Sequence, residues 1–433
     1  MLRRLNINNF VKDVASLSSS QIIGLGLSFF TSVLVARLLG PEKKGIVVTI
    51  LTIPSLISVF ADLGIRSATT YFMGKHIYDD QTILSNLAVL TLIISIISVV
   101  VAVLIYHWDA LPQQYGWVVI AIALVILPLK LVSILGNSVL LAKQHIRALA
   151  VASILEQTIY LIVVVSLAIS KSIQVASILS AQVFAACVSA IYIVTVVRQY
   201  GRLRLAFSPE LTWRLLKLGF VYAAALFVLN INYRVDVILL QRLSNDSEVG
   251  IYSVGVTIAE LLWLVPQALS TVNFARSSAT QNSLDYAHKT AIVMRVAFWG
   301  GLIPSALLFL CAPPAITFIY GEAYIKSGVV VQAILPGVLM ALFFKVLNSD
   351  LAGRGRPDAA FWVYGAVAIL NIALNIWLIP IYGCLGSAWA STVSYSTGAI
   401  IFVFVYSRIS QMSPSEVFLP RLSDFQKLFV AQR

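Results

Sequence analysis

Long apolar blocks recur along the whole chain, and they constrain the fold more than any other feature. Each block holds about 18 or more mostly apolar residues, enough for a helix that crosses the roughly 30 Å hydrocarbon core of a bilayer. Of the 433 residues, 59% are apolar and only 11% are charged. A water-soluble domain of this size would need far more polar surface. The sequence therefore predicts an all-α integral membrane protein.

Twelve blocks are assigned as membrane-spanning helices, six in each half of the chain. The expected spans of the first half are residues 18–39, 45–70, 83–106, 116–142, 151–170 and 175–197. Those of the second half are 218–241, 249–273, 291–312, 328–349, 360–380 and 386–407. The expected domains are a six-helix lobe with an amphipathic N-terminus (1–200), a basic amphipathic linker on the cytoplasmic side (201–217), a second six-helix lobe (218–408) and a cytoplasmic tail (409–433).

Short motifs that recur about half a chain apart indicate an internal repeat. An Arg-Leu pair closes an apolar block at Arg37 and again at Arg242, and Gly-Ile opens the next block eight residues after each arginine. Similar motifs also begin at Leu141 and at Leu351. The sequence thus predicts one module that is present twice.

The distribution of positive charge predicts the orientation of the spans. Twenty of the 30 Lys and Arg residues fall on the side of the N-terminus, six fall on the other side and four lie well inside spans. Cytoplasmic loops carry the excess of Lys and Arg, so both termini are expected in the cytoplasm. Because each half holds an even number of spans, the two halves form a parallel repeat, related by an axis along the membrane normal. These loops account for the net charge of +12, and nucleic acid is not an expected partner.

Eight charged residues within the expected spans are candidates for function. The cations are Arg66, Lys130, Arg234 and Lys345, and the acids are Asp62, Glu156, Asp236 and Glu260. A cation at mid-membrane costs roughly 2.5–3.5 kcal/mol on insertion scales, so these side chains should face a partner or water rather than lipid. Spans 3, 6, 11 and 12 carry no central charge and are interpreted as an apolar outer ring.

Depth within the span separates the cations. Lys130 lies near the middle of its span, two residues after Pro128, and is interpreted as part of a polar lining. Arg66 lies near a helix end with Asp62 four residues before it, a spacing that favours a local ion pair. For Arg66 and for Lys345, a side chain that reaches the membrane surface is as well supported as a role in transport.

The acids leave two interpretations open. Arg234 and Asp236 are two residues apart and cannot face each other on a helix, so each needs a partner on another span, and Glu260 is a candidate. A buried pair between helices and a role in transport explain these residues equally well. Glu156 is interpreted as a carboxylate at a helix end.

Other types of site receive no support from the sequence. The cysteines Cys187, Cys311 and Cys384 are far apart and are interpreted as small apolar side chains, and the four histidines are isolated in loops. No metal site, cofactor or catalytic residue is predicted. The longest outer loop, at about residues 106–116, is too short for a catalytic domain, which argues against an enzyme such as a polysaccharide polymerase or ligase.

Glycine-containing motifs at the ends of spans carry a family resemblance. They are Ala36–Pro41 with Gly45, Asp62–Ile65, Val249–Tyr252, Ile319–Gly321 and Ile379–Gly386. In this order and spacing they resemble the polysaccharide flippases of the multidrug/oligosaccharidyl-lipid/polysaccharide (MOP) exporter superfamily. The resemblance covers nearly the whole chain. It implies two six-helix lobes around a central cavity, as in the MATE exporters, and transport by alternating access.

The resemblance also implies a cargo and a set of binding residues. The cargo is undecaprenyl-diphosphate-linked oligosaccharide for O-antigen or exopolysaccharide assembly in the bacterial inner membrane, with membrane lipids, a polysaccharide polymerase and chain-length proteins as partners. Spans 1, 2, 4, 7, 8 and 10 line the cavity in that fold, and all four intramembrane cations fall on these spans. Substrate binding is expected at Lys130, Arg234, Arg66 and Lys345, and gating or ion pairing at Asp62, Asp236 and Glu260.

A cation-coupled multidrug or metabolite exporter of the same superfamily is the alternative. Asp236 and Glu260 would then be proton or sodium sites. Drug-exporting relatives often use an acidic residue in the first span, and residues 18–39 hold none, which favours the flippase. Because an anion that moves out of a negative cell interior gains roughly 2.3 kcal/mol per charge per 100 mV, the membrane potential alone is hypothesised to drive export.

Overall fold

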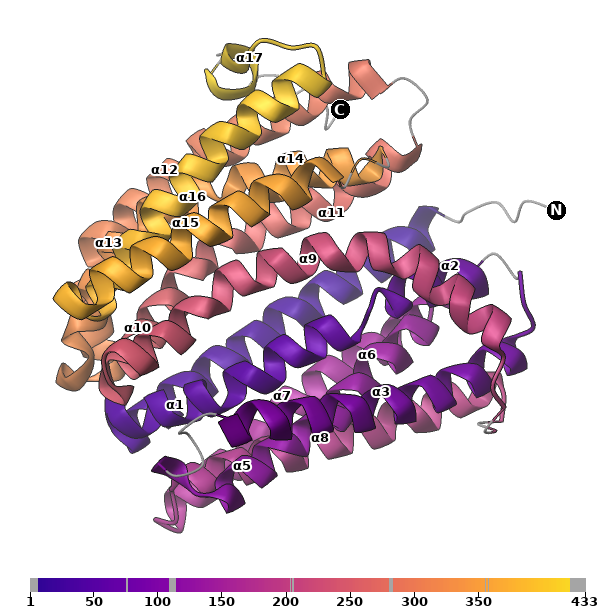
Figure 1. The fold of residues 1–433 in the computed structure, drawn as a ribbon, viewed down its shortest axis with the longest axis horizontal. Coiled ribbons are helices and arrows are strands. Elements are labelled where there is room, and N and C mark those ends of the chain that lie inside the picture. The colour runs from indigo at the N-terminus through magenta and orange to yellow at the C-terminus, as the bar shows by residue number, and fades with distance from the viewer. Residues whose placement is uncertain are drawn as a thin grey trace. The chain divides into compact units, whose positions relative to one another are not determined.

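The computed structural model describes residues 7–74, 77–108, 114–202, 204, 206–279, 283–354, 356 and 358–420 (Figure 1). Within these residues every regular element is a helix, which confirms the expected all-α fold. The side chains of Met1–Leu17 and the tail beyond residue 420, both expected to be amphipathic, lie outside the described part of the chain.

Backbone contacts divide the chain into two units, Met1–Phe227 and Val228–Arg433. The first unit contains α1 (Ile7–Ala61), α2 (Ile65–Gly74), α3 (Asp80–Trp108), α5 (Trp117–Leu124), α6 (Ile126–Ala142), α7 (Ile146–Ile169), α8 (Val175–Val197) and the short η1 (Arg198–Tyr200). Helix α9 (Pro209–Leu243) begins in the first unit and ends in the second.

The second unit continues with α10 (Asp246–Glu260), η2 (Leu261–Trp263), α11 (Leu264–Ala279), α12 (Ser283–Tyr320), η3 (Glu322–Tyr324), α13 (Ile325–Met340), α14 (Leu342–Gly353), α15 (Asp358–Tyr382), α16 (Cys384–Ile409) and α17 (Pro414–Phe418). All twelve expected spans lie in these helices or in pairs of helices interrupted by one turn. In the described residues, nine helical stretches are long and apolar enough to cross a membrane, and the first, Ile22–Gly74, holds two of the expected spans. The expected spans 218–241 and 249–273, which carry three of the intramembrane charges, are not among the nine.

Helix α9 joins two segments that the sequence suggests are separate. The expected linker helix and the expected span 218–241 are parts of this one helix of 35 residues. At its start the Ser208 hydroxyl accepts a hydrogen bond from the backbone N–H of Leu211 at 3.3 Å and caps the helix. Leu211 and Leu215 are fully buried in the first unit, so the first turns of α9 pack against that unit rather than lying free.

Breaks in the helices occur in the same spans of both halves. Span 2 is interrupted at Asp62–Gly64, where Leu63 and Gly64 have φ angles of 44° and 69°, and its counterpart, span 8, is interrupted at η2. Span 4 is divided between α5 and α6 at Val125, and its counterpart, span 10, is divided between α13 and α14 at Ala341. The recurrence supports the predicted repeat.

The cytoplasmic ends predicted for spans 4 and 10 also carry similar contacts. In the first unit Lys143 pairs with Asp80 and lies 5.9 Å from the ring centre of Tyr200. In the second unit Arg354 pairs with Asp350, and its guanidinium lies 5.8 Å from the ring centre of Tyr406. In each half a cation at the end of the fourth span thus contacts a tyrosine near the end of the last span. The tyrosine lies in the turn after that span in the first half and within the span in the second.

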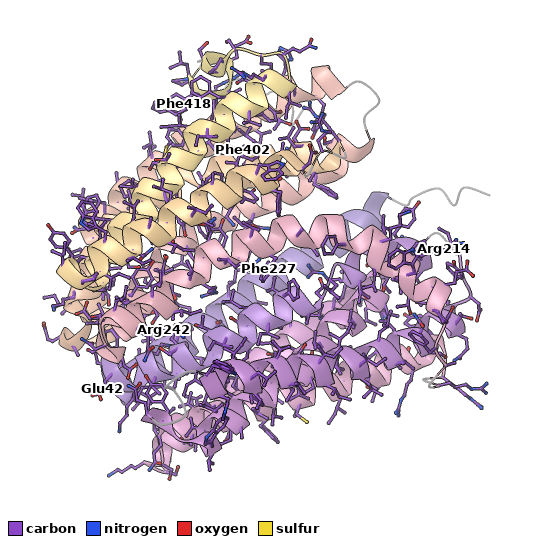
Figure 2. All side chains as sticks on the ribbon, in the orientation of Figure 1. Glu42, Arg214, Phe227, Arg242, Phe402 and Phe418 are labelled. Carbon is purple, nitrogen blue, oxygen red and sulfur yellow. The ribbon has the colours of Figure 1, made fainter. Side chains whose placement is uncertain are left out.

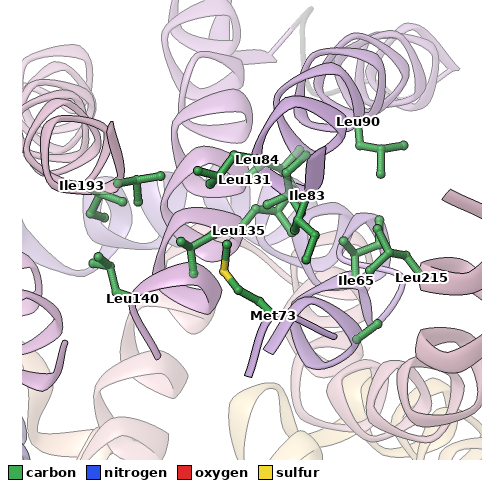
Figure 3. Packing of buried hydrophobic residues seen from close by; sticks show 14 of the residues in the cluster. Ile65, Met73, Ile83, Leu84, Leu90, Leu131, Leu135, Leu140, Ile193 and Leu215 are labelled. Carbon is green, nitrogen blue, oxygen red and sulfur yellow. The ribbon is translucent and has the colours of Figure 1, made fainter. Parts of the chain in front are cut away.

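The largest apolar core described in the first unit joins α2, α3, α6, α8 and the start of α9. Figure 3 labels members of this core. Ile65, Leu131 and Leu215 are among them, and these three are fully buried. In the second unit, the short α17 returns to the helical bundle. Figure 2 labels Phe418 on this helix. Its ring stacks on Phe343 with ring centres 5.7 Å apart, and the indole N–H of Trp299 donates to its carbonyl at 3.0 Å.

Gly64 and Gly219 let the break in span 2 lie close against α9. A Cβ added at Gly64 would lie 2.1 Å from the carbonyl oxygen of Gly219 on α9, and its φ of 69° already disfavours a side chain. The break in span 2 and the path of α9 therefore depend on two glycines in contact.

We predict that Gly64→Ala lowers the apparent melting temperature of the purified protein in detergent by roughly 2 °C or more, since an overpacked contact costs about 1–3 kcal/mol. The matched control is Gly365→Ala on α15, where an added Cβ meets no atom within 4 Å. Equal melting temperatures for Gly64→Ala and the native chain would show that this contact is not a constraint.

Candidate functional site

Lys345 lies at the centre of a polar and aromatic cluster in the second unit. Its Nζ is 4.2 Å from the ring centre of Trp263 and 5.6 Å from that of Tyr233. The same Nζ donates to Oε1 of Gln267 at 3.4 Å. The rings of Tyr233 and Trp263 are 5.1 Å apart, so the two aromatic side chains and the amine form one packed group. The half-buried Lys345 side chain thus lies against the Trp263 and Tyr233 rings of its own unit.

Glu260 supplies the negative charge of this cluster. Its carboxylate lies close enough to both Arg234 and Lys345 for electrostatic attraction. Glu260, the predicted candidate partner of Arg234, thus lies within electrostatic reach of it. Arg234 itself is exposed, whereas Glu260 and Lys345 are half-buried. One acid and two cations leave this cluster with a net positive charge.

The charged residues of this cluster lie next to the helix breaks. Glu260 is the last residue of α10, immediately before η2, and Lys345 lies in the first turn of α14, just after the break at Ala341. A 3-10 turn within a helix, such as η2, often marks a functional position, and interrupted helices at membrane depth occur where the backbone is buried in protein or lines a water-filled cavity. The two broken spans bring an acid and a base together, although 85 positions separate them in the sequence.

The first unit pairs its charges in the same manner. Lys130, on α6 and five residues after the break at Val125, lies within electrostatic reach of Glu156 on α7. Glu156 is therefore the partner of an intramembrane cation, a role that its position near a helix end does not reveal. Arg66 and Asp62 form the predicted local pair across the break in span 2, with Nε 3.7 Å from Oδ2.

Asp236 has a different environment from the other acids. It is 2% exposed, and its carboxylate accepts hydrogen bonds from the Tyr252 hydroxyl at 2.7 Å, the Ser391 hydroxyl at 2.7 Å and the Asn375 amide at 2.9 Å. Asn371 extends the network, because its carbonyl and side-chain oxygens accept from the same Asn375 amide. All of these hydrogen-bond donors are neutral. Asp236 thus keeps its place through hydrogen bonds, apart from the cation cluster around Lys345.

Sequence reasoning missed several members of these clusters. Tyr233 and Gln267 hold Lys345, and Asn371, Asn375 and Ser391 hold Asp236. The asparagines come from span 11 and the serine from span 12, which were interpreted as parts of an apolar outer ring. That interpretation is wrong for the faces that meet Asp236. The available signal was the pair of amides at positions 371 and 375, one helical turn apart in an apolar span.

Comparisons with known families and proteins give a consistent result. The model of a family described as "Polysaccharide biosynthesis protein" matches residues 10–274. The probable flippase AglR of Haloferax volcanii is 27% identical over 184 residues, which are 41% of this chain and 39% of AglR. An uncharacterized membrane protein of Methanocaldococcus jannaschii, MJ1375, is 24% identical over 178 residues, which are 41% and 42% of the two chains. The chain thus spans about two fifths of the length of the curated relatives that it matches.

Solved structures show the same fold over nearly the whole chain. The lipid II flippase MurJ in an inward closed conformation has a TM-score of 0.74 at 16% identity, covering 98% of this chain and 92% of MurJ. An inward-facing MATE family multidrug transporter of the MOP superfamily has a TM-score of 0.70 at 16% identity, covering 92% and 98% of the two chains. These similarities confirm the expected MOP-type exporter fold.

We predict that the Lys130–Glu156 pair is energetically coupled. Lys130→Gln and Glu156→Gln each leave one charge without its partner, and we expect each to lower the free energy of unfolding by about 2 kcal/mol, because the pair is half-buried. The double variant Lys130→Gln/Glu156→Gln should recover most of the loss. The measurement is the apparent melting temperature of the four proteins in one detergent. Strictly additive losses in the double variant would mean that the two side chains do not pair.

Proposed function

Because the chain belongs to the polysaccharide biosynthesis protein family, we propose that it is a flippase that moves lipid-linked oligosaccharides from the cytoplasmic to the outer leaflet. The names of AglR and MurJ, both flippases, support this proposal. The relatives with a named activity transport their substrates rather than transform them. Transport would proceed by alternating access through a cavity between the two six-helix halves.

The physical problem that such a protein solves is the transfer of sugars through hydrocarbon. Each hydroxyl that loses its water costs on the order of 1–3 kcal/mol, so an oligosaccharide of several sugars faces a barrier of tens of kcal/mol. A hydrated path keeps the hydroxyls solvated while the lipid tail stays in the bilayer. The diphosphate between lipid and sugar still needs positive partners within the path.

The observation that carries the proposal is the set of intramembrane cations, each with a carboxylate of its own unit. Lys130 lies near Glu156, Arg66 near Asp62, and both Arg234 and Lys345 near Glu260. These pairs offset the free-energy cost of burying the cations when no substrate is bound. A bound diphosphate would then replace the carboxylates, Glu156 at Lys130 and Glu260 at Lys345, as the partner of the amines. Substrate binding is in this proposal an exchange of anions.

The finer assignments follow from this proposal. The carrier lipid would be undecaprenyl diphosphate in the inner membrane of a bacterium, with both termini in the cytoplasm. The oligosaccharide would be a repeat unit of O-antigen or exopolysaccharide, delivered to a polysaccharide polymerase and its chain-length proteins. The excess of Lys and Arg in the loops on the N-terminal side supports the orientation.

A second candidate, a cation-coupled exporter, is favoured by the surroundings of Asp236. A buried carboxylate with only neutral hydrogen-bond donors retains an uncompensated charge, which a proton or a sodium ion would neutralise. Such an ion could couple transport to a gradient in a flippase as well as in a drug exporter. Resistance to drugs in cells that overproduce the protein would favour the drug exporter, and loss of polysaccharide export on deletion would favour the flippase.

We predict that Lys130→Gln/Glu156→Gln reduces flipping at least tenfold in reconstituted vesicles, because the double variant removes the cation without leaving an unpaired acid. The measurement is the transfer of a fluorescent polyprenyl-diphosphate-linked sugar between leaflets. Lys130→Arg retains the charge and should keep most of the rate. Lys171→Gln, which removes an exposed cation from a loop, is the matched control. Normal flipping by the double variant would refute a role for Lys130 in binding the diphosphate.

We also predict that Asp236→Asn makes transport insensitive to imposed proton or sodium gradients while leaving transport driven by the membrane potential. Asparagine preserves the shape of the side chain and can bond to the same neighbours, so the fold should be retained. Rates are compared in vesicles with each gradient applied alone. If a gradient still accelerated transport by Asp236→Asn, the coupling ion would bind elsewhere.

A further inference from the structure

A groove in the first unit lies among α3, α6 and α8. Its volume is about 250 Å³, and every residue that lines it is apolar except Thr91. Helix α6 packs against both α3 and α8 and forms the floor, and Gly136 lets α6 approach α8 closely, since a Cβ there would lie 2.3 Å from Ile193. Figure 3 shows Leu84, Leu135 and Ile193 around this space.

The shape and lining of the groove suit one saturated hydrocarbon chain. The lining positions on α3 run from Leu84 to Leu92, which is roughly 12 Å along the helix and close to the roughly 15 Å depth of one leaflet. No aromatic residue lines the groove. Leu92 is 52% exposed, so the groove is open along its side and accessible to lipid. Its volume is below the roughly 300–1,000 Å³ of sites for drug-sized ligands.

Two arginines stand at one end of the groove. Val197 lines that end, and the next residue, Arg198, is exposed. Arg202 is also exposed, and its backbone is fixed beside the groove by the Gln81 side chain, which accepts from Arg202 N at 2.8 Å and donates to its carbonyl. Gly201 lies against Leu84, with 3.0 Å between a Cβ added there and Cδ1. The chain after α8 is therefore held against the start of α3.

Two acidic residues also lie near this end, where the three cations Arg198, Arg202 and Lys143 outnumber them. Asp80 pairs with Lys143, and Asp79 accepts a hydrogen bond from the backbone N–H of Gln81 at 3.0 Å. The two arginines thus place positive charge at this end of the apolar groove, which is its mouth. By the positive-inside rule this mouth lies at the cytoplasmic surface, where anionic headgroups are found.

We infer that this groove is a binding site for one acyl chain of an anionic glycerophospholipid, whose phosphate lies against Arg198 and Arg202. The charge at the mouth selects an anionic headgroup, and the length of the groove matches an acyl chain within one leaflet. A polyprenyl carrier would extend far beyond the groove. The inference does not depend on what the protein transports, and it adds a resident lipid that braces α3 against α8.

The test uses the full-length protein purified in detergent and offered phosphatidylglycerol and phosphatidylcholine at equal concentration. Native mass spectrometry counts each retained lipid. We expect phosphatidylglycerol to be retained about tenfold more than phosphatidylcholine. Arg198→Gln and Arg202→Gln should each weaken this retention about fivefold, since one basic residue near the membrane surface strengthens the binding of an anionic headgroup by about that factor. Arg214→Gln, which removes an exposed arginine paired with Glu210, should leave retention unchanged.

Variants that fill the groove test the site itself. Ala88→Phe should abolish retention, and Leu92→Trp tests the same space from an exposed position that does not endanger folding. The control is Ala306→Phe in a second apolar groove between α12 and α13, which no Lys or Arg lines. Three results would overturn the inference: native retention by the filled variants, equal retention of both lipids, or displacement of phosphatidylglycerol by polyprenyl phosphate at equal concentration.

Discussion

A charged side chain at the centre of a bilayer costs roughly 2.5–3.5 kcal/mol on insertion scales unless it meets an opposite charge or water. In this protein each intramembrane cation meets a carboxylate within its own half. Lys130 lies near Glu156 in the first unit, and Lys345 lies near Glu260 in the second. If the halves move relative to each other, as the proposed transport requires, pairs within one half need not break during the cycle.

The helix breaks are the structural means by which the pairs form. Glu260 ends α10, and Lys345 follows the break at Ala341 by one turn. In the first unit Asp62 lies at the break in span 2. Counterpart spans are broken in both halves, so the arrangement belongs to the repeated module rather than to one half. The aromatic rings of Trp263 and Tyr233 then fix the amine of Lys345 in a defined position.

The sequence predicts the features that depend on local chemistry. The lengths of the apolar blocks determine the spans, and Gly40, with a φ angle of 74°, separates the first two. The i, i+4 spacing predicts the ion pair of Asp62 and Arg66. It does not predict contacts between distant helices. Glu156 is 26 residues from Lys130, and nothing in the pattern of α7 shows which side of the helix faces α6. Asp236 finds neutral donors on spans 11 and 12 because those helices pack against it, a property of the tertiary structure alone.

The proposed transport depends on a diphosphate that takes the place of the carboxylates at the intramembrane cations. Infrared difference spectroscopy of the purified protein, recorded on addition of a polyprenyl diphosphate, observes those carboxylates directly. The account predicts a shift in the carboxylate bands that disappears in the Glu156→Gln/Glu260→Gln variant. Binding of the polyprenyl diphosphate with unchanged carboxylate bands would contradict it.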